Sequence, residues 1–131
     1  MDRNALFKWT KEQFGTDPEY LWARYPGYAV LRNGGNRKWY ALIMDVPRGR
    51  LGVSGNGTVD IVDVKCGPIV SGSLRRGQGF LPAYHMNREN WVSVLLDGTV
   101  PEEEIKRLIE LGYELTAPKQ KRASRQKRCE P

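Results

Sequence analysis

The residue type in this chain best suited to acid–base chemistry near neutral pH occurs once, as His85. A catalytic pair with Cys66 would need hydrogen-bond contact and a lowered thiol pKa, and nothing in the spacing of the two residues indicates either. One histidine and one cysteine outside the charged C-terminal segment also fall short of the four ligands that structural zinc prefers. We therefore predict no catalytic residue, no metal and no cofactor, and we expect His85 to fix its loop by bonding backbone groups.

A ligand-contacting role for His85 is the alternative. The segment around it also supplies amide and guanidinium groups, and a lysine precedes Cys66 in a predicted strand. A groove for a small ligand or a protein partner would then be lined by Lys65, His85, Asn87, Arg88 and Trp91.

Basic side chains are the second group that could do chemistry, because they bind phosphate. The net charge is +6, but residues 119–131 alone carry +5, which leaves +1 for residues 1–118. The basic residues of this C-terminal segment are Lys119, Lys121, Arg122, Arg125, Lys127 and Arg128. A segment so polar cannot build a core, so we expect a disordered tail that either contacts nucleic acid without reading its sequence or only aids solubility.

Three glycine-containing loops carry further basic residues. They hold Arg32, Arg37 and Lys38, then Arg48 and Arg50, then Arg75 and Arg76. The third lacks the spacing and the Lys-Ser/Thr ending of a phosphate-binding P-loop. Such loops can approach phosphates, although ordinary solvated hairpins have the same composition. Four aromatic residues could stack on unpaired bases, although core packing is the alternative for them: Trp39, Tyr40, Tyr84 and Trp91.

The elements that position these residues follow from periodicity and turn signals. Asp2 can cap a helix over Arg3–Phe14, and a short helical turn is expected over residues 19–25. Strands are expected over residues 28–32, 37–46, 58–66 and 91–96, with a hairpin turn at 33–36, a glycine-rich loop at 47–57 and a short helix within 69–75. In the second strand Trp39, Ala41 and Ile43 should share one face, and Tyr40, Leu42 and Met44 the other.

The C-terminal part is expected to hold one more helix. Alternation in the third strand predicts that Asp63 and Lys65 face water. Thr99 and Glu102 have the spacing of a capping box, and Gly112 should end the helix that follows. Because hairpins connect successive strands, the chain predicts an α+β fold, in which a twisted antiparallel sheet of at least four strands is covered by N- and C-terminal helices. The two basic hairpin loops would then lie at opposite ends of strand 37–46, so one flat duplex would not touch both unless the sheet is strongly twisted or the loop folds back.

The string PAYHMNRENWVSVLLDGTVPEEEIKRLIELGYELT, together with YPGYAVLR, RKWYALIMDV and VDIVDVKCGP upstream, resembles the MmcQ/YjbR family over about residues 3–118. The resemblance implies a frataxin-like, CyaY-like two-layer sandwich. It also implies DNA binding through a double-wing arrangement of hairpins. Gly112 stands where the family suggests serine, and the loop at 47–57 is long.

The whole chain is therefore expected to form one domain, residues 1–118, followed by a tail, residues 119–131. It has no apolar run long enough to span a membrane and no targeting segment, and its two cysteines are not expected to pair. We expect a cytoplasmic, monomeric, non-enzymatic protein that binds DNA weakly and without sequence preference. The rival is a protein- or small-ligand-binding module that uses the groove around His85, Asn87 and Lys65.

Overall fold

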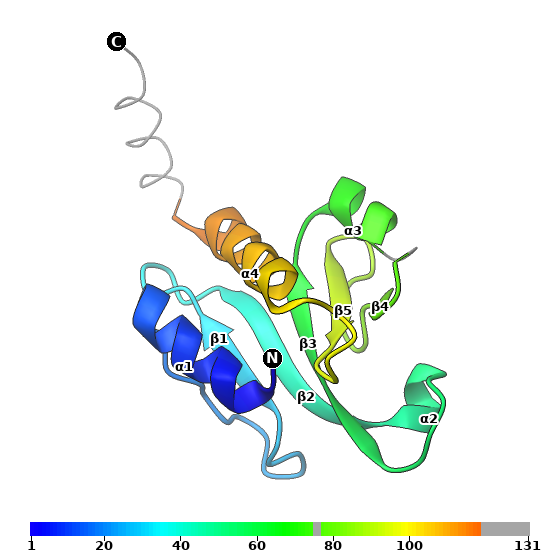
Figure 1. Ribbon diagram of the computed structural model, residues 1–131. Coiled ribbons are helices and arrows are strands. Elements are labelled where there is room, and N and C mark those ends of the chain that lie inside the picture. The colour runs from blue at the N-terminus through cyan, green and yellow to red at the C-terminus, as the bar shows by residue number, and fades with distance from the viewer. Residues whose placement is uncertain (75–76, 119–131) are drawn as a thin grey trace.

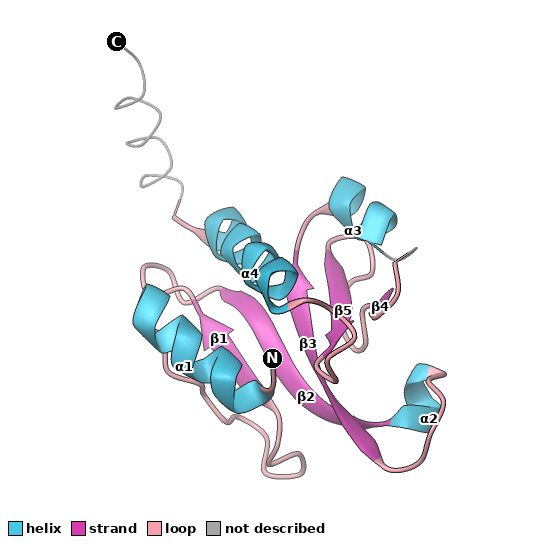
Figure 2. Ribbon diagram, viewed as in Figure 1, coloured by secondary structure: helices cyan, strands magenta, loops and turns pink. Residues whose placement is uncertain are grey.

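The computed structural model describes residues 1–74 and 77–118 of the chain. Within them, five antiparallel strands form one sheet in the order β1-β2-β3-β5-β4. The strands are β1 (Ala29–Arg32), β2 (Trp39–Pro47), β3 (Thr58–Lys65), β4 (Phe80–Pro82) and β5 (Trp91–Leu95). Figures 1 and 2 show α1 (Arg3–Phe14) and α4 (Glu102–Thr116) side by side on one face of a twisted sheet, with α2 (Arg48–Leu51) and α3 (Pro68–Leu74) at its margins. The predicted α+β fold is confirmed; the three-residue strand β4 and the single-turn helix α2 were missed.

Helix α1 begins and ends where the sequence predicts. The Asp2 carboxylate accepts a hydrogen bond of 2.8 Å from the Ala5 amide, which satisfies one of the free donors at the helix start. Gly15 has φ of 68° and closes the C-terminus in the left-handed conformation. Leu6 is fully buried and packs between α1, α4 and the sheet. This face of the sheet, toward the two helices, is called the inner face below.

Strand β2 corrects one predicted detail. The register with β1 shifts between Leu31, which pairs with Ala41, and Arg32, which pairs with Trp39. This β-bulge puts Tyr40 and Ala41 together in the inner core and turns Trp39 to the opposite, outer face. Both halves of the predicted alternation were therefore wrong at the start of β2, because a bulge breaks the alternation of side chains. Trp39 does not share a face with Ala41 and Ile43, and Tyr40 does not share one with Leu42 and Met44.

Helix α4 also differs from its predicted bounds. Thr99 donates its hydroxyl hydrogen to the Asp97 carboxylate, so the predicted capping box does not form, and Pro101 occupies the N-cap position. Gly112 lies inside the helix rather than at its end. A side chain there would meet the backbone oxygens of Lys65 and Tyr40 at 3.0 Å, so glycine permits close approach of helix and sheet.

The outer face of the sheet is covered mainly by loops, and Leu51 of the single-turn helix α2 also packs against it. A second core of buried residues lies there, including Val30, Leu42 and Met44. The segment between α1 and β1 runs along this edge: the amide and carbonyl of Glu19 bond those of Val30, at 3.0 and 2.9 Å. Because Glu19 pairs as a strand residue, the predicted helical turn over residues 19–25 is wrong. The predicted glycine-rich loop at 47–57 contains the single turn of α2.

Candidate functional site

A groove on the outer face is lined mainly by aromatic rings. It has a volume of about 240 Å³, and we call it the aromatic groove; its residues are Trp22, Tyr25, Tyr28, Trp39, Leu42, Met44, His85 and Met86. The segment before β1, strand β2 and the loop before β5 all contribute to it. Leu42 and Met44 are buried, so they form an apolar floor, whereas Tyr25 is 45% exposed.

The rings of the groove brace one another. Trp22 meets Trp39 edge-on, with ring centres 5.7 Å apart and planes at 85°, and meets Tyr28 at 6.0 Å and 72°. Tyr25 stacks on Tyr28 at 4.7 Å and 18°. Edge-to-face and offset-stacked pairs are the favoured aromatic geometries. The groove is therefore preorganised by the contacts among its own walls.

His85 lies at the rim of the aromatic groove. Its φ is 66°, a left-handed backbone conformation that is uncommon for a residue with a side chain. The imidazole ring sits 4.0 Å from the Tyr84 ring, between ring centres, and the residue is exposed. Within residues 1–74 and 77–118 the imidazole makes no hydrogen bond, so the predicted anchoring through backbone groups is wrong. Cys66 is buried in the inner core, on the other side of the sheet.

A buried carboxyl lies beneath the loop that carries His85. Asp63 is fully buried, contrary to the prediction that it faces water. The Ser93 hydroxyl donates to one carboxyl oxygen of Asp63 and accepts a 2.9 Å hydrogen bond from the Tyr84 amide. Burial raises the pKa of Asp63 to about 8, although the hydrogen bond from Ser93 opposes the rise. A protonated Asp63 thus supports the loop from below.

Arg50 stands at another part of the rim. The Tyr84 side chain lies near enough to the Arg50 guanidinium to raise the pKa of Arg50, and Tyr25 and Tyr28 add to the effect. Arg50 is exposed. This residue of the second predicted basic loop therefore stands beside the aromatic groove.

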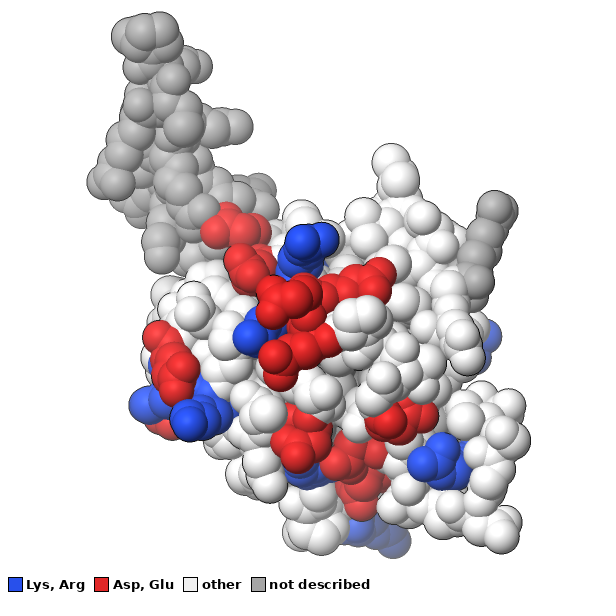
Figure 3. Space-filling model, viewed as in Figure 1, with Lys and Arg blue, Asp and Glu red and all other residues white. Residues whose placement is uncertain are grey.

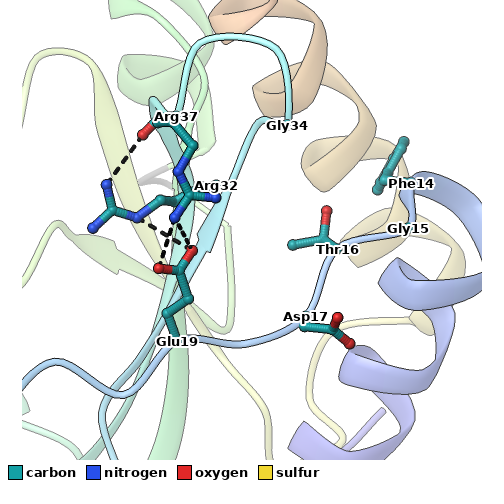
Figure 4. Close-up of a pocket in the computed structure, with 8 residues that line it drawn as sticks. All are labelled: Phe14, Gly15, Thr16, Asp17, Glu19, Arg32, Gly34 and Arg37. Atoms are coloured by element: carbon teal, nitrogen blue, oxygen red, sulfur yellow. Dashed lines mark hydrogen bonds and ion pairs between the residues drawn. The ribbon is translucent and has the colours of Figure 1, made fainter.

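Arg32 and Arg37 lie in a separate polar cleft of about 300 Å³ (Figure 4), which we call the arginine cleft; it is lined by Phe14, Gly15, Thr16, Asp17, Glu19, Arg32, Gly34 and Arg37. Both carboxylate oxygens of Glu19 accept hydrogen bonds of 2.8 Å from Arg37. The Arg32 guanidinium reaches the same carboxylate at 3.3 Å and lies 5.9 Å from the centre of the Trp39 ring. Two predicted phosphate contacts are thus gathered around one acid.

The first predicted wing does not project freely. The Asn33 and Asn36 side-chain amides donate to the Tyr113 and Thr116 carbonyls of α4, at 3.2 and 2.8 Å. The hairpin is therefore tied to the end of α4, with Lys38 exposed beside it. The second basic loop, which begins at Arg48, follows the far end of β2, so the prediction that the two loops lie at opposite ends of one strand is confirmed.

The remaining predicted groove residues do not join His85 in one pocket. Asn87 caps the turn that follows it, since its side-chain oxygen accepts from the Glu89 and Asn90 amides at 2.8 and 3.2 Å. Trp91 is buried at the start of β5, where it pairs with Lys65, and Arg88 is exposed. Arg75, Arg76 and the six basic residues of the tail lie outside the described residues: Lys119, Lys121, Arg122, Arg125, Lys127 and Arg128.

Sequence reasoning missed Trp22, Tyr25 and Tyr28 as site residues. The signal was a local concentration of aromatic residues from Tyr20 to Tyr28, in a segment that follows Pro18 and contains Pro26. The interpretation of this segment as a helical turn hid that signal.

The helix-bearing side of the molecule does not resemble a nucleic-acid surface. Figure 3 shows acidic side chains gathered over α4 on this side, with basic groups scattered among them. Among the described residues no three of histidine, cysteine, aspartate and glutamate lie close enough to hold a metal ion. None of the described helices combines the length and apolarity that crossing a membrane requires.

The chain is similar in sequence and in structure to known proteins. A family model described as YjbR matches residues 12–115. The uncharacterized protein YyaQ of Bacillus subtilis is 48% identical over 116 residues, which are 88% of this chain and 98% of YyaQ. A crystal structure from Pseudomonas syringae is similar with a TM-score of 0.87 and 43% identity, over 89% of this chain and all of that one. The Deinococcus radiodurans protein DR2400 has a TM-score of 0.69 and 25% identity, over 91% and 80% of the two chains.

Proposed function

The chain belongs to the YjbR family, and from this premise we propose that it is a non-enzymatic protein that binds nucleic acid by holding unpaired bases in the aromatic groove. One observation carries the proposal. An open groove with an apolar floor is walled by four aromatic rings and has a guanidinium at its rim. Every nucleobase has a π-face, so such a groove accepts bases without reading their sequence.

The energetics suit weak and unspecific binding. Stacking one base on an aromatic side chain is worth about 1–3 kcal/mol, and positive charge near the rings attracts the backbone. Arg50 beside Tyr84 and Arg32 beside Trp39 supply such charge at two places next to the groove. The basic tail predicted from the sequence adds six positive side chains, each of which can release a counterion from the strand.

A duplex fits less well than a single strand. The two basic loops follow opposite ends of β2, so one flat duplex would not contact both at once. Paired bases in a duplex also hide the π-faces that the groove would contact. We therefore propose a monomeric cytoplasmic protein whose DNA target is unpaired, and we treat RNA as a second arm of every binding test.

The test compares two tyrosines of one segment. Tyr25 lines the groove and is 45% exposed, whereas Tyr20 is 56% exposed and lies outside the groove lining. Both side chains are exposed, but Tyr25→Ala also removes the ring that stacks on Tyr28, so the stability of both variants is measured alongside binding. We expect Tyr25→Ala to weaken binding of a fluorescent oligothymidylate by about 5- to 100-fold in anisotropy titrations, and Tyr20→Ala by less than about twofold. Equal effects of the two variants would contradict the proposal.

The rival function, a protein- or small-ligand-binding module, rests on one specific observation. The groove holds about 240 Å³ and places His85 at its rim, so a small aromatic compound could fill it without any phosphate. Thymidine as a competitor separates the two functions. If thymidine binds as tightly as the oligonucleotide, phosphates contribute nothing and the small-ligand function is the better one.

A further inference from the structure

We infer that Arg32 and Arg37 form a phosphate subsite for the strand in the aromatic groove, and that the Glu19 carboxylate occupies this subsite in the free protein. The inference rests on the function proposed for the groove and adds where the backbone of the strand binds. It also assigns Glu19 a role as an internal competitor of the ligand.

The cluster has more positive than negative charge. The Glu19 carboxylate accepts hydrogen bonds of 2.8 Å from Arg37 and forms an ion pair with Arg32 at 3.3 Å. Arg37 keeps 60% of its side chain exposed, and a guanidinium has five N–H donors. An incoming phosphate can therefore approach Arg37 from solvent and take over the donors that now hold Glu19, with geometry that suits bidentate pairing.

The cluster borders the groove through a shared residue. Arg32 belongs to the arginine cleft and lies over Trp39 at 5.9 Å, while Trp39 lines the aromatic groove. A base held against Trp39 thus has the Arg32 guanidinium as its neighbour. One nucleotide can occupy both places, with its base in the groove and its phosphate on the cluster.

The backbone holds Arg37 in an unusual conformation. Its φ is 65°, in the left-handed region, and its amide donates to the Asn33 carbonyl at 2.8 Å. Asn33 and Asn36 in turn are tied to α4. A residue with a side chain is costly at this φ, and such strain concentrates at ligand sites. Glycine would adopt this conformation at lower cost. A ligand-binding role for the Arg37 guanidinium explains why arginine occupies the position instead.

These features give two substitutions with opposite expected effects. Arg37→Gly removes the guanidinium and relieves the backbone, so the fold is kept and the phosphate contact is lost. Glu19→Gln removes the competing charge while keeping the size of the side chain and the backbone pairing with Val30. If Glu19 were only a structural partner of the arginines, its neutralisation would weaken or leave unchanged the binding of an anion. If it is a competitor, binding becomes tighter.

The experiment measures oligothymidylate binding to the full chain by anisotropy across a salt series. We expect Arg37→Gly to weaken binding about 5- to 10-fold and to reduce the slope of log K against log salt by about 0.7, the value for one phosphate on a single strand. We expect Glu19→Gln to tighten binding about 3-fold or more. Matched controls with the same charge changes are Arg107→Gly and Glu110→Gln on the exposed side of α4, each expected to change binding by less than about twofold. Test variants that behave like these controls would overturn the inference.

A second measurement separates this inference from the function of the groove. Pyrophosphate alone is titrated into the protein while NMR follows the Arg32 and Arg37 side-chain signals. If pyrophosphate changes the chemical shifts of these signals, and changes them more in Glu19→Gln, the subsite is supported. If no strand binds in the same protein, only the function proposed for the groove is contradicted. If the strand binds with the Tyr25 dependence but neither the pyrophosphate shifts nor the two variants respond, only the subsite fails.

Discussion

At the scale of single residues, the sequence singles out His85 for acid–base chemistry, whereas the structure singles out Asp63. Burial raises the pKa of Asp63 to about 8. His85 could be recognised because it is the only histidine, and the structure places it at the rim of a groove. Asp63 could not be recognised. Strand alternation predicts an exposed carboxylate, but the Tyr84 loop covers that position through Ser93. Coverage by a loop distant in sequence leaves no trace in the period of a strand.

Asp63 makes stability depend on pH. Its pKa rises from 3.8 in the unfolded chain to about 8 in the fold, so the folded state binds an extra proton between these values. The contribution is therefore fully present below about pH 4 and is lost as the pH rises through about 8. Each unit in this window costs about 1.4 kcal/mol, so the free energy of unfolding should fall by several kcal/mol.

Chemical denaturation at about pH 5, 7 and 8.5 measures this loss. Asp63→Asn is the matched variant, because it keeps the shape and carries no charge at any of these values. We expect its stability to vary much less with pH than that of the unchanged protein. Parallel curves for the two proteins would show that Asp63 does not titrate in this range.

At the scale of elements, local signals predict starts and turns well and contacts between elements poorly. The Asp2 cap, Gly15 and the hairpin after β1 follow from residues within a few positions of each other. Gly112 does not. Glycine ordinarily ends a helix, but here it lies against the backbone oxygens of Lys65 and Tyr40. That role depends on two partners, 47 and 72 residues away in the sequence, which no local pattern indicates.

Substitution of Gly112 tests this packing. A Cβ there would lie 3.0 Å from two backbone oxygens that the sheet holds in place, so strain should outweigh the gain of about 1 kcal/mol that alanine offers in a helix. We expect Gly112→Ala to lower the free energy of unfolding by about 1–2 kcal/mol, in the range for overpacking. Gly72 in α3 has nothing within 4 Å of such a Cβ, so Gly72→Ala should be neutral or stabilising. A Gly112→Ala protein with an unchanged or higher free energy of unfolding would contradict the close contact between helix and sheet.

At the scale of the whole molecule, the sheet separates two different surfaces. The inner face is closed by α1 and α4, whose outer side is acidic over α4. The outer face is closed by loops and the single turn of α2, and it keeps an open aromatic groove. The sequence is sufficient to predict the fold class, which the family match supports over residues 12–115. It was not sufficient to predict the groove, because Trp22, Tyr25 and Tyr28 come together only when their segment is laid along β1.

The most direct test of this account compares one oligonucleotide in two forms, single-stranded and annealed to its complement, for binding to the full chain at about 50 mM salt. Anisotropy gives both affinities under the same conditions. Only an unpaired base can enter the groove. We therefore predict that the single strand binds at least about tenfold more tightly than the duplex, a difference of about 1.4 kcal/mol in binding free energy. A duplex that binds as tightly as the single strand, or no binding of either form, would contradict the central claim.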